Sequence, residues 1–563
     1  MKRIILFTLF LFSCAPVSIV IDRYDNNREK TVAIMKVDKK DGFVDSVTVE
    51  LLTYHPNGQL ASSTDMLRNI QHGKHVAYSP TGEVIAKGQF ENNRKSDKWS
   101  WFGRDGIPDS LRTFEKGMLS GKSIDYSSSG EKTREIMYLN HKYHGKSIQY
   151  NDNGKKSLIG EYMHGIPHGK WTWFNTSGKK ERIVTYKKGI KDGPVSIWND
   201  QGKKAMTGTY INDKKNGEWK WHSDNKGLDS LIQFSENKYM GKYQIWHVNG
   251  QKAVNGEYQN GIKIGEWKWY TINGNLDSTK IFSNGMLNGP VQFYYGSGTA
   301  INKVSTISFE PLEEIISKVK NKIIPGESKI KTKMTYSNGK LQGEKIDYYL
   351  NGQEQSSWTY DMGIRTGPFT EWNSSGLKKE SGTYLNDKPN GVIYNWYGHG
   401  QLFSVTTYSK GDVHGVMRIY SPSGVITKEA YFYFGQPLCQ LDYFDNGRIK
   451  QVQVFKRNIV VFQKNWNNLG METTLTRFKT GITTKTDRYF SGNLRSEKSM
   501  KGNELHGLSW AFNEEHALEY LSLYIDGKHV FRRDYLLEEN EYKDYIFPNS
   551  ELQVVVKIEV EEN

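Results

Sequence analysis

Glycine recurs at a fixed interval of 24 residues along much of this chain. These glycines, called frame glycines below, run without a slip through Gly121, Gly145, Gly169, Gly193, Gly217, Gly241, Gly265 and Gly289, and the interval resumes at Gly343, Gly367, Gly391 and Gly415. A strict period of this length indicates that one structural unit is added repeatedly. The length of 563 residues therefore does not imply several globular domains, as it would in a chain without repeats.

Each unit carries the signals of a β-hairpin. An aromatic residue such as Tyr150 stands 5 residues after the frame glycine, and another, such as Tyr162, stands 17 residues after it. A second glycine such as Gly154 follows 9 residues after the frame glycine, as expected for a tight turn that requires positive φ. The pattern predicts an all-β fold, an elongated antiparallel β-meander or solenoid of about twenty 24-residue hairpin repeats.

The units also resemble a known repeat family. Residues 160–178 read Gly-Glu-Tyr, two His-Gly steps and Lys-Trp-x-Trp-Phe, and this pattern resembles the bacterial variant of the MORN repeat. The resemblance extends over residues 49–527 and weakens after Leu438. It implies a long antiparallel β-meander and no particular reaction. Some members of the family are described as antitoxin-like, so an immunity protein is one alternative.

A second period of 48 residues appears in the tryptophan pairs Trp171 and Trp173, Trp219 and Trp221, and Trp267 and Trp269. Centring the turn between residues 166 and 167 places Gly160 opposite Trp173 and Tyr162 opposite Trp171. The same arithmetic places Gly208 opposite Trp221. We expect each indole to cover a strand glycine beside a cross-strand aromatic partner, and we expect stacking between units rather than a ligand platform.

The N-terminus predicts export and lipid anchoring. Residues 1–13 combine Lys2 and Arg3 with an apolar run that is too short to span a bilayer, as in a signal peptide. Cys14 follows Ser13 in a context that resembles a bacterial lipobox, which implies a membrane anchor at that thiol. The residue after it, Ala15, is not the acidic residue that resembles an inner-membrane retention signal, so we expect an outer-membrane lipoprotein. Ordinary secretion is the alternative.

Breaks in the pattern divide the remaining chain. We expect a tether and N-terminal edge at residues 14–48, a first repeat array at 49–298, a second array at 331–437, degenerate repeats at 438–530 and a C-terminal cap at 531–563. The insert at residues 299–330 contains a stretch, 311–323, with helical spacing of apolar residues. It predicts one short helix that packs on the sheet, forms a hinge or docks a partner.

No arrangement typical of catalysis or cofactor binding is evident. His72, His144, His168, His414 and His506 each precede a frame glycine or its equivalent, so we assign them a structural role in the turns between units rather than a metal site. Cys439 is expected to be a buried thiol. The net charge of +14 is spread along the chain, which favours a solvated surface over a nucleic-acid groove.

These features predict a non-enzymatic, lipid-anchored envelope protein that acts as a scaffold or protein-interaction surface. Its expected partners are the membrane, through Cys14, and an envelope protein. The alternative from a different class is a carbohydrate- or peptidoglycan-binding module that uses the aromatic ladders, with cell-wall polysaccharide as its ligand. Nucleic acid, cofactors and metal ions are not expected.

Overall fold

The computed structural model describes residues 15–40, 43–223, 227–296, 328–474, 481–515, 517–536, 541–547 and 554–556. The regular elements of the described residues are all β-strands, apart from one short 3-10 helix at Arg104–Gly106. The chain divides into two compact units, Met1–Ile262 and Lys263–Asn563. The all-β prediction is therefore confirmed, whereas the signal peptide, Cys14 and the helix expected at 311–323 lie outside the described residues.

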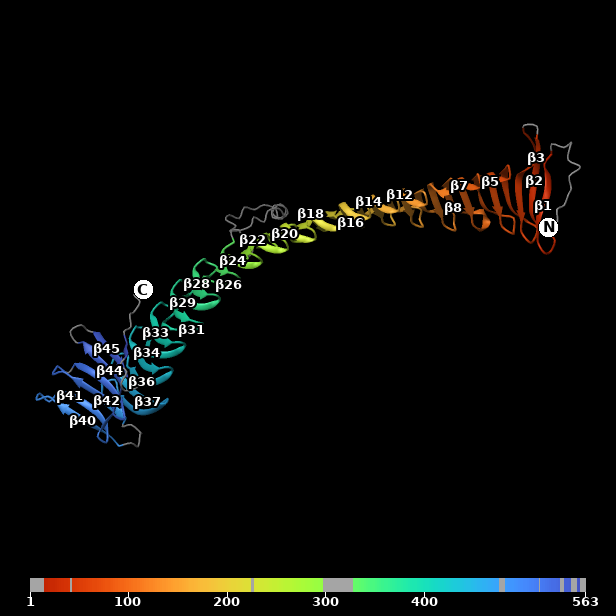
Figure 1. The fold of residues 1–563 in the computed structure, drawn as a ribbon. Helices are drawn as coiled ribbons and strands as arrows, with labels where there is room; N and C mark the ends of the chain where they lie inside the picture. The colour runs from red at the N-terminus through yellow and green to blue at the C-terminus, as the bar shows by residue number, and fades with distance from the viewer. Residues whose placement is uncertain are drawn as a thin grey trace, which may run out of the picture. The chain divides into compact units, whose positions relative to one another are not determined.

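The first unit is an open antiparallel meander in which each strand pairs with the strand that follows it (Figure 1). The two-residue strand β9 pairs back with β8, which also pairs with β10. Its strands are β1 (Val17–Arg23), β2 (Glu29–Lys40), β3 (Phe43–Tyr54), β4 (Leu60–Leu67), β5 (Ile70–Tyr78), β6 (Val84–Glu91), β7 (Arg94–Phe102), β8 (Pro108–Glu115), β9 (Met118–Leu119), β10 (Gly121–Tyr126), β11 (Lys132–Leu139), β12 (Lys142–Tyr150), β13 (Lys156–Met163), β14 (Ile166–Phe174), β15 (Lys180–Lys187), β16 (Ile190–Trp198), β17 (Lys204–Ile211), β18 (Lys214–Ser223), β19 (Gly227–Ser235), β20 (Lys238–Trp246) and β21 (Lys252–Gln259).

The second unit contains a further run of the meander and a separate sheet of seven strands, β40 to β46. The meander strands are β22 (Ile262–Tyr270), β23 (Leu276–Ser283), β24 (Met286–Tyr294), β25 (Ile330–Ser337), β26 (Lys340–Leu341), β27 (Gly343–Tyr348), β28 (Glu354–Asp361), β29 (Ile364–Trp372), β30 (Lys378–Leu385), β31 (Lys388–Pro389), β32 (Gly391–Trp396), β33 (Leu402–Ser409), β34 (Asp412–Tyr420), β35 (Ile426–Tyr433), β36 (Gln436–Tyr443), β37 (Ile449–Lys456), β38 (Ile459–Trp466) and β39 (Glu472–Thr474). The separate sheet contains β40 (Ile482–Arg488), β41 (Leu494–Lys501), β42 (Glu504–Phe512), β43 (Leu518–Ile525), β44 (Lys528–Leu536), β45 (Glu541–Ile546) and β46 (Val554–Val556).

The frame glycines lie in β-bulges within the strands. In the β11–β12 pair, Tyr138 faces Tyr143 and Ile136 faces Ser147, so the three residues around Gly145 face the single residue Met137. The extra residues require a left-handed backbone, and Gly145 has a φ of 91°. All eight frame glycines from Gly121 to Gly289 have positive φ. The 24-residue period is therefore the period of this bulge.

The register predicted from the tryptophans is wrong. The turn between β13 and β14 consists of His164 and Gly165, with φ of 51° and 85°, and Met163 pairs with Ile166. Positive φ at both turn residues is typical of the type I′ turn. The turn therefore lies two residues earlier than expected, and the bulge then shifts the pairing so that Leu158 faces Trp173 and Tyr162 faces Pro167.

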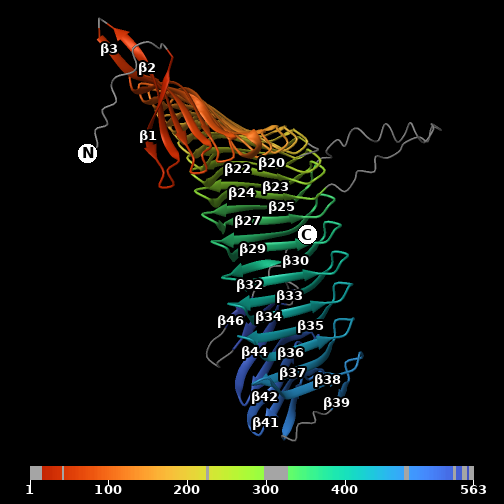
Figure 2. The ribbon, with the colours of Figure 1, turned by 90° about the vertical axis from the view of Figure 1, so that its right-hand side faces the viewer.

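The separate sheet packs on one face of strands β34 to β38 and forms a sandwich with them. Figures 1 and 2 both show β42 and β44 beside β36 and β37. Its core includes side chains from both layers, among them Tyr431, Leu441, Phe462, Leu521 and Phe531, which are at most 2% exposed. Cys439 is also buried in this core, as expected from the sequence.

Candidate interaction surfaces

The first tryptophan of each pair is part of the packed interior. Trp171, Trp219 and Trp267 are 6%, 0% and 1% exposed. The indole of Trp219 lies against Gly208, where an added Cβ would stand 2.2 Å from a ring carbon, and its N–H donates to the Thr209 carbonyl oxygen at 3.2 Å. Trp171 covers Gly160 in the same way. The predicted packing of indole on glycine is confirmed at Gly160 and Gly208, with the first tryptophan of the pair instead of the second.

The second tryptophan is half-buried and lies beside the first. The ring centroids of Trp171 and Trp173 are 6.0 Å apart, and those of Trp219 and Trp221 are 5.9 Å apart. The guanidinium of Arg182 lies over Trp173 at 4.2 Å from the centroid. Trp269, the corresponding residue of the third pair, is likewise half-buried against Trp267. Neighbouring rings and cations therefore occupy much of the aromatic surface that a ligand platform would need.

The predicted aromatic neighbour of Trp171 does contact it. Tyr162 meets the indole edge to face, with centroids 5.1 Å apart, although Tyr162 is not directly opposite it in the register. In the next repeat pair, Lys215 lies over both Trp219 and Trp221, at 4.7 Å and 5.4 Å. Such contacts add about 0.5–1.5 kcal/mol each beyond simple burial. Tyr162 joins β13 to β14, and Lys215 on β18 also lies over Phe234 on β19, so these contacts hold neighbouring strands of the array together.

Three of the predicted turn histidines hold the next turn in place. The Nδ1 atoms of His144, His414 and His506 accept hydrogen bonds from backbone N–H groups exactly one hairpin later, those of His164, Phe434 and Asp526. Each histidine lies on a strand just after a turn, and its partner is the corresponding turn residue of the following unit. The structural role is confirmed for these three. His72 and His168 have no hydrogen-bond partner for Nδ1 in the structure.

A row of exposed side chains follows the two-residue turns along one edge of the first unit. Apolar members are 37–47% exposed, and each lies at the last or first position of a strand beside a turn. The row, called the turn-edge stripe below, consists of Leu139, Met163, Ile166, Ile190 and Ile211 together with the facing lysines Lys142, Lys187 and Lys214. An added Cβ on Gly189 would stand 2.9 Å from a methyl carbon of Ile166. The stripe is therefore continuous from one turn to the next.

A groove in the second unit gathers polar and aromatic side chains. It encloses about 200 Å³ and is lined by Tyr295, Lys331, Asp347, Tyr349, Gln355, Ser356, Glu371, Trp372 and Lys379. Asp347 and Glu371 occupy equivalent positions in successive repeats, as do Lys331, Gln355 and Lys379. Equivalent positions of successive repeats thus bring two carboxylates, and two lysines with a glutamine, together in the groove.

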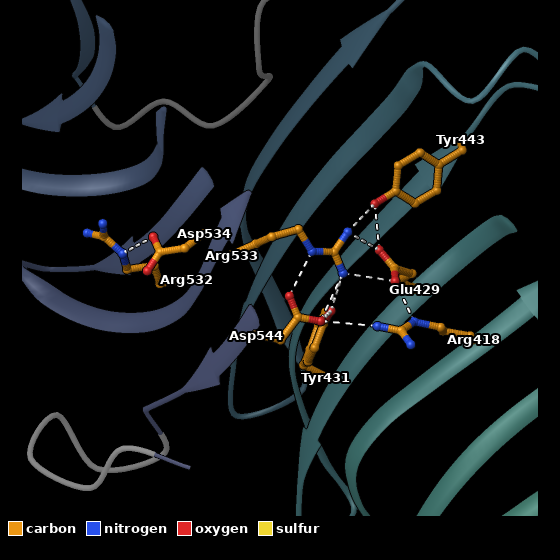
Figure 3. Close-up of polar contacts among 8 residues, drawn as sticks. All are labelled: Arg418, Glu429, Tyr431, Tyr443, Arg532, Arg533, Asp534 and Asp544. Carbon is orange, nitrogen blue, oxygen red and sulfur yellow. Dashed lines mark hydrogen bonds and ion pairs between the residues drawn. The ribbon is translucent and has the colours of Figure 1, made fainter. Parts of the chain in front are cut away.

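The sandwich contains a buried cluster of charges, shown in Figure 3. Arg533 on β44 donates to Asp544 Oδ1 at 2.7 Å and to Glu429 Oε1 at 2.9 Å. Arg418 donates to the same Glu429 oxygen at 2.7 Å and to Asp544 Oδ2 at 3.2 Å. The hydroxyl of Tyr431 donates to Asp544 at 2.7 Å. Two arginines and two carboxylates therefore balance in charge and join β34 and β35 to β44 and β45.

This cluster remains ionised in spite of its burial. Glu429 and Asp544 are 0% exposed. Burial by itself raises the pKa of Glu429, but Arg533 and Arg418 outweigh it and hold that pKa at about 2. Tyr443 contributes a hydrogen bond of 2.6 Å to Glu429. Because every charged group is paired, the arrangement is a rigid connection between two sheets and offers no free acid or base for chemistry.

Neither the groove nor the buried cluster was identified from the sequence. The groove had a usable signal, because Asp347 and Glu371 stand where Trp173 and Trp221 stand in other repeats. The cluster had no such signal, since its residues on β34 and β35 are more than a hundred residues away along the chain from those on β44 and β45. Among the described residues, no group of three or more His, Cys, Asp or Glu side chains could hold a metal ion. No described helix has the length and apolar character needed to cross a membrane.

Comparisons with solved structures give only distant likenesses. A crystal structure of TcdB2-TccC3-TEV is 10% identical over 93% of this chain and 32% of its own, with a TM-score of 0.13. The Photorhabdus luminescens Tc holotoxin pore is 11% identical over 94% of this chain and 32% of its own, also with a TM-score of 0.13. A porin-like protein from Bacteroides uniformis is 11% identical over 62% of this chain and 92% of its own, with a TM-score of 0.10. The chain spans about a third of the first two structures, and TM-scores this low carry no functional argument.

The sequence comparison is more specific. No curated protein matches the chain. The family model described as the MORN repeat variant matches residues 167–188. These residues cover β14 from its second residue, the following turn and β15, which is one hairpin of the meander with its frame glycine Gly169. Residues 167–188 thus match the MORN repeat variant, and the 24-residue glycine period continues on both sides of this segment.

Proposed function

We propose that this chain is a non-enzymatic, lipid-anchored scaffold of the bacterial envelope and that it binds a protein partner along the turn-edge stripe. MORN repeats in general suggest interaction with proteins or membranes. The observation that carries the proposal is the exposure of Met163, Ile166 and Ile211, which are 45–47% exposed. Large apolar side chains aligned at equivalent positions indicate a surface that another molecule covers.

The composition of the stripe favours a protein over a bilayer. Its apolar members are aliphatic or Met, whereas surfaces that settle at a membrane interface are enriched in Trp and Tyr. Lys142, Lys187 and Lys214 each face an apolar member across a turn. A partner with apolar residues spaced at about 10 Å, which is two strand separations, and acidic residues between them would complement it.

The anchor is a separate part of the proposal. Acylation of the Cys14 thiol would add long hydrocarbon chains, and two or more chains give stable membrane attachment. Fractionation of cells that express the native chain and Cys14→Ala tests it. We expect the native chain in the membrane fraction and the variant in the soluble fraction. Equal distribution of both would contradict the anchor without affecting the stripe.

Crosslinking in the native envelope tests the stripe. The variant Ile166→Glu with Ile190→Glu places two carboxylates in the stripe, and we expect the crosslinked protein partner to be lost. The matched control is Thr176→Glu with Gln201→Glu, which places the same charges in exposed turns at the other edge of the hairpins. Retention of the partner by the stripe variant would contradict the proposal. Loss of binding to anionic vesicles instead of to a protein would assign the stripe to the membrane.

A further inference from the structure

Short polar residues line the groove of the second unit at a position where bulky ones stand in some other repeats. In the first unit, Trp173 and Trp221 stand four residues after their frame glycines and fill this position of the sheet. The equivalent residues of the second array are Asp347 and Glu371. The shorter side chains leave about 200 Å³ open between neighbouring hairpins. This space is smaller than a typical drug-sized pocket and suits about one ring of a ligand.

Asp347 is fixed in position as an ionised carboxylate. Thr332 donates its hydroxyl to Asp347 at 2.6 Å, and Lys345 donates to it at 2.7 Å. Ser356 donates at 3.3 Å to Asp347 Oδ2, the oxygen that also accepts from Lys345. Burial alone raises the pKa of Asp347, but these donors outweigh burial and lower it. The wall of the groove is therefore rigid and polar before any ligand arrives.

Two phenols on the groove are also oriented. Tyr349 donates its hydroxyl to the Trp372 carbonyl oxygen at 2.9 Å, and Tyr295 donates to the Tyr348 carbonyl oxygen at 2.5 Å. Because each hydroxyl proton is used, each phenol oxygen is left to accept a hydrogen bond from a ligand hydroxyl. The ring of Trp372 is half-buried and supplies an apolar wall. Hydroxyl acceptors beside an aromatic face match the alternating polar and apolar surface of a sugar ring.

The lining contains two lysines and two carboxylates, and Lys345 beside it adds a third positive charge. Lys379 pairs with Glu371 at 3.2 Å, and Asp347 pairs with Lys345. Lys331 also lines the groove, and its ammonium group lies 5.9 Å from the centroid of the Tyr295 ring. No carboxylate of the described residues forms an ion pair with Lys331. One positive charge is therefore left to attract an anion.

We propose that this groove binds one unit of an acidic saccharide, with Trp372 against the sugar ring and Lys331 on its carboxylate or other acidic group. The saccharide hydroxyls form hydrogen bonds with the side chains of Tyr295, Tyr349 and Gln355, which line the groove. The groove belongs to the second unit and the turn-edge stripe to the first, so the site adds a glycan ligand to the proposed protein partner. It also differs from the aromatic ladder considered from the sequence, whose rings are packed within the sheet.

Isothermal titration of the full-length chain tests the site, with a glucuronic-acid disaccharide and a neutral glucose disaccharide as probes. We expect saturable binding of the acidic probe and a loss of at least about tenfold in affinity for Lys331→Gln, which removes one charge-assisted contact. Trp372→Ala should lose binding of the same probe. The control Lys340→Gln removes a charge from the exposed first residue of β26 in the same array and should bind like the native chain.

Circular dichroism of each variant separates loss of binding from loss of fold. If Trp372→Ala is unfolded, Lys331→Gln decides the test, because the structure gives Lys331 no ion pair that holds the fold. Equal binding of both probes, equal affinity of native chain and Lys331→Gln, or no saturable binding would each overturn the proposal. Partner crosslinking by the stripe should be unchanged in all three variants, so failure of one proposal is distinguishable from failure of the other.

Discussion

Strands β12 to β18 of the first unit and the sandwich of the second unit are held together in different ways. In the repeats, Trp219 contacts side chains of neighbouring hairpins, such as Tyr210 and Phe234, which are close in sequence. In the sandwich, Arg418 and Asp544 are 126 residues apart in sequence and form an ion pair. Hairpins of one type therefore build two structures. One is an array held by contacts between residues close in sequence, and the other is a closed core held by contacts between residues far apart in sequence.

The two regions should differ in how far the effect of a destabilising substitution extends. A repeat array is stabilised by each unit and by its contacts with its neighbours, so damage in one hairpin should stay near that hairpin. The sandwich buries Glu429, Asp544 and Arg533 together, so the loss of one member leaves the others without a counter-charge. We expect damage to spread through both layers of the sandwich and to remain local in the repeats.

The largest effect is expected from Arg533→Met. Removing this guanidinium leaves Glu429 and Asp544 buried with only Arg418 between them, and breaking such a pair costs about 3–5 kcal/mol. Hydrogen exchange measured by mass spectrometry should show β34, β35, β44 and β45 losing protection together. Arg532→Ala, on the same strand, is the matched control because the Arg532 pair with Asp534 is partly exposed and contributes at most about 1 kcal/mol. Equal effects of both variants would remove the distinction between the two regions.

Acid should affect the sandwich next most strongly. The pKa of Glu429 is about 2 in the folded chain against an ordinary value of 4.5, so its contribution is present above pH 4.5 and is lost as the pH falls toward 2. The size is on the order of 3 kcal/mol. In the first unit, Glu135 also has a pKa of about 2, but its partners Lys122 and Lys132 are largely exposed.

High salt should distinguish the stabilising effects of Glu135 and Glu429. At about 1 M salt, the exposed pairs of Glu135 are screened, whereas the buried pairs of Glu429 are screened much less. We expect exchange at β35 and β44 to remain acid-dependent in high salt and exchange at β10 and β11 to become less so. Glu429→Gln should flatten the acid dependence of the sandwich. If salt flattens both regions equally, the cluster is not shielded from solvent as its burial indicates.

A smaller and strictly local effect is expected from Gly208→Ala. The added Cβ would stand 2.2 Å from an indole carbon of Trp219, and overpacking of this kind costs about 1–3 kcal/mol. Gly398→Ala is the control, because its Cβ meets nothing within 4 Å and its φ is not in the left-handed region. Hydrogen exchange should increase in β16 to β19 for Gly208→Ala and remain native in the sandwich. Loss of protection throughout the first unit would show that the repeats are not independent.

The fold was predictable because the same residue types recur at the same positions of many repeats. Glycines at fixed intervals indicated the hairpins, and pairs such as Trp219 and Trp221 indicated the packing on strand glycines. The register was missed because the bulge at the frame glycine adds residues to one strand, and a bulge has no signal distinct from that of a turn glycine. Both are glycines with positive φ, as Gly145 and Gly154 are.

The sandwich and the groove could not be predicted from the sequence in the same way. Residues 438–530 carry weakened repeat signals, and nothing in that pattern distinguishes a continued meander from a second sheet that folds back. Arg418 stands at a position occupied by Thr172 and Lys220 in other repeats, so its burial depends wholly on what packs over it. Local sequence patterns predict strands and turns. The segment that packs on an open face of a sheet depends on residues far away in the sequence.

The smallest effect, and the sharpest test of locality, is expected from His144→Ala. The Nδ1 of His144 accepts a hydrogen bond of 3.4 Å from the backbone N–H of His164 in the next turn, and loss of such a bond costs about 1 kcal/mol. Asn390 stands at the equivalent position of another repeat, where its Oδ1 accepts from the N–H of Lys410. His144→Asn should therefore restore protection of the His164 turn that His144→Ala loses. If His144→Asn behaves like His144→Ala, the ring supports the turn by packing on His164, whose centroid is 4.8 Å away, and not by its nitrogen.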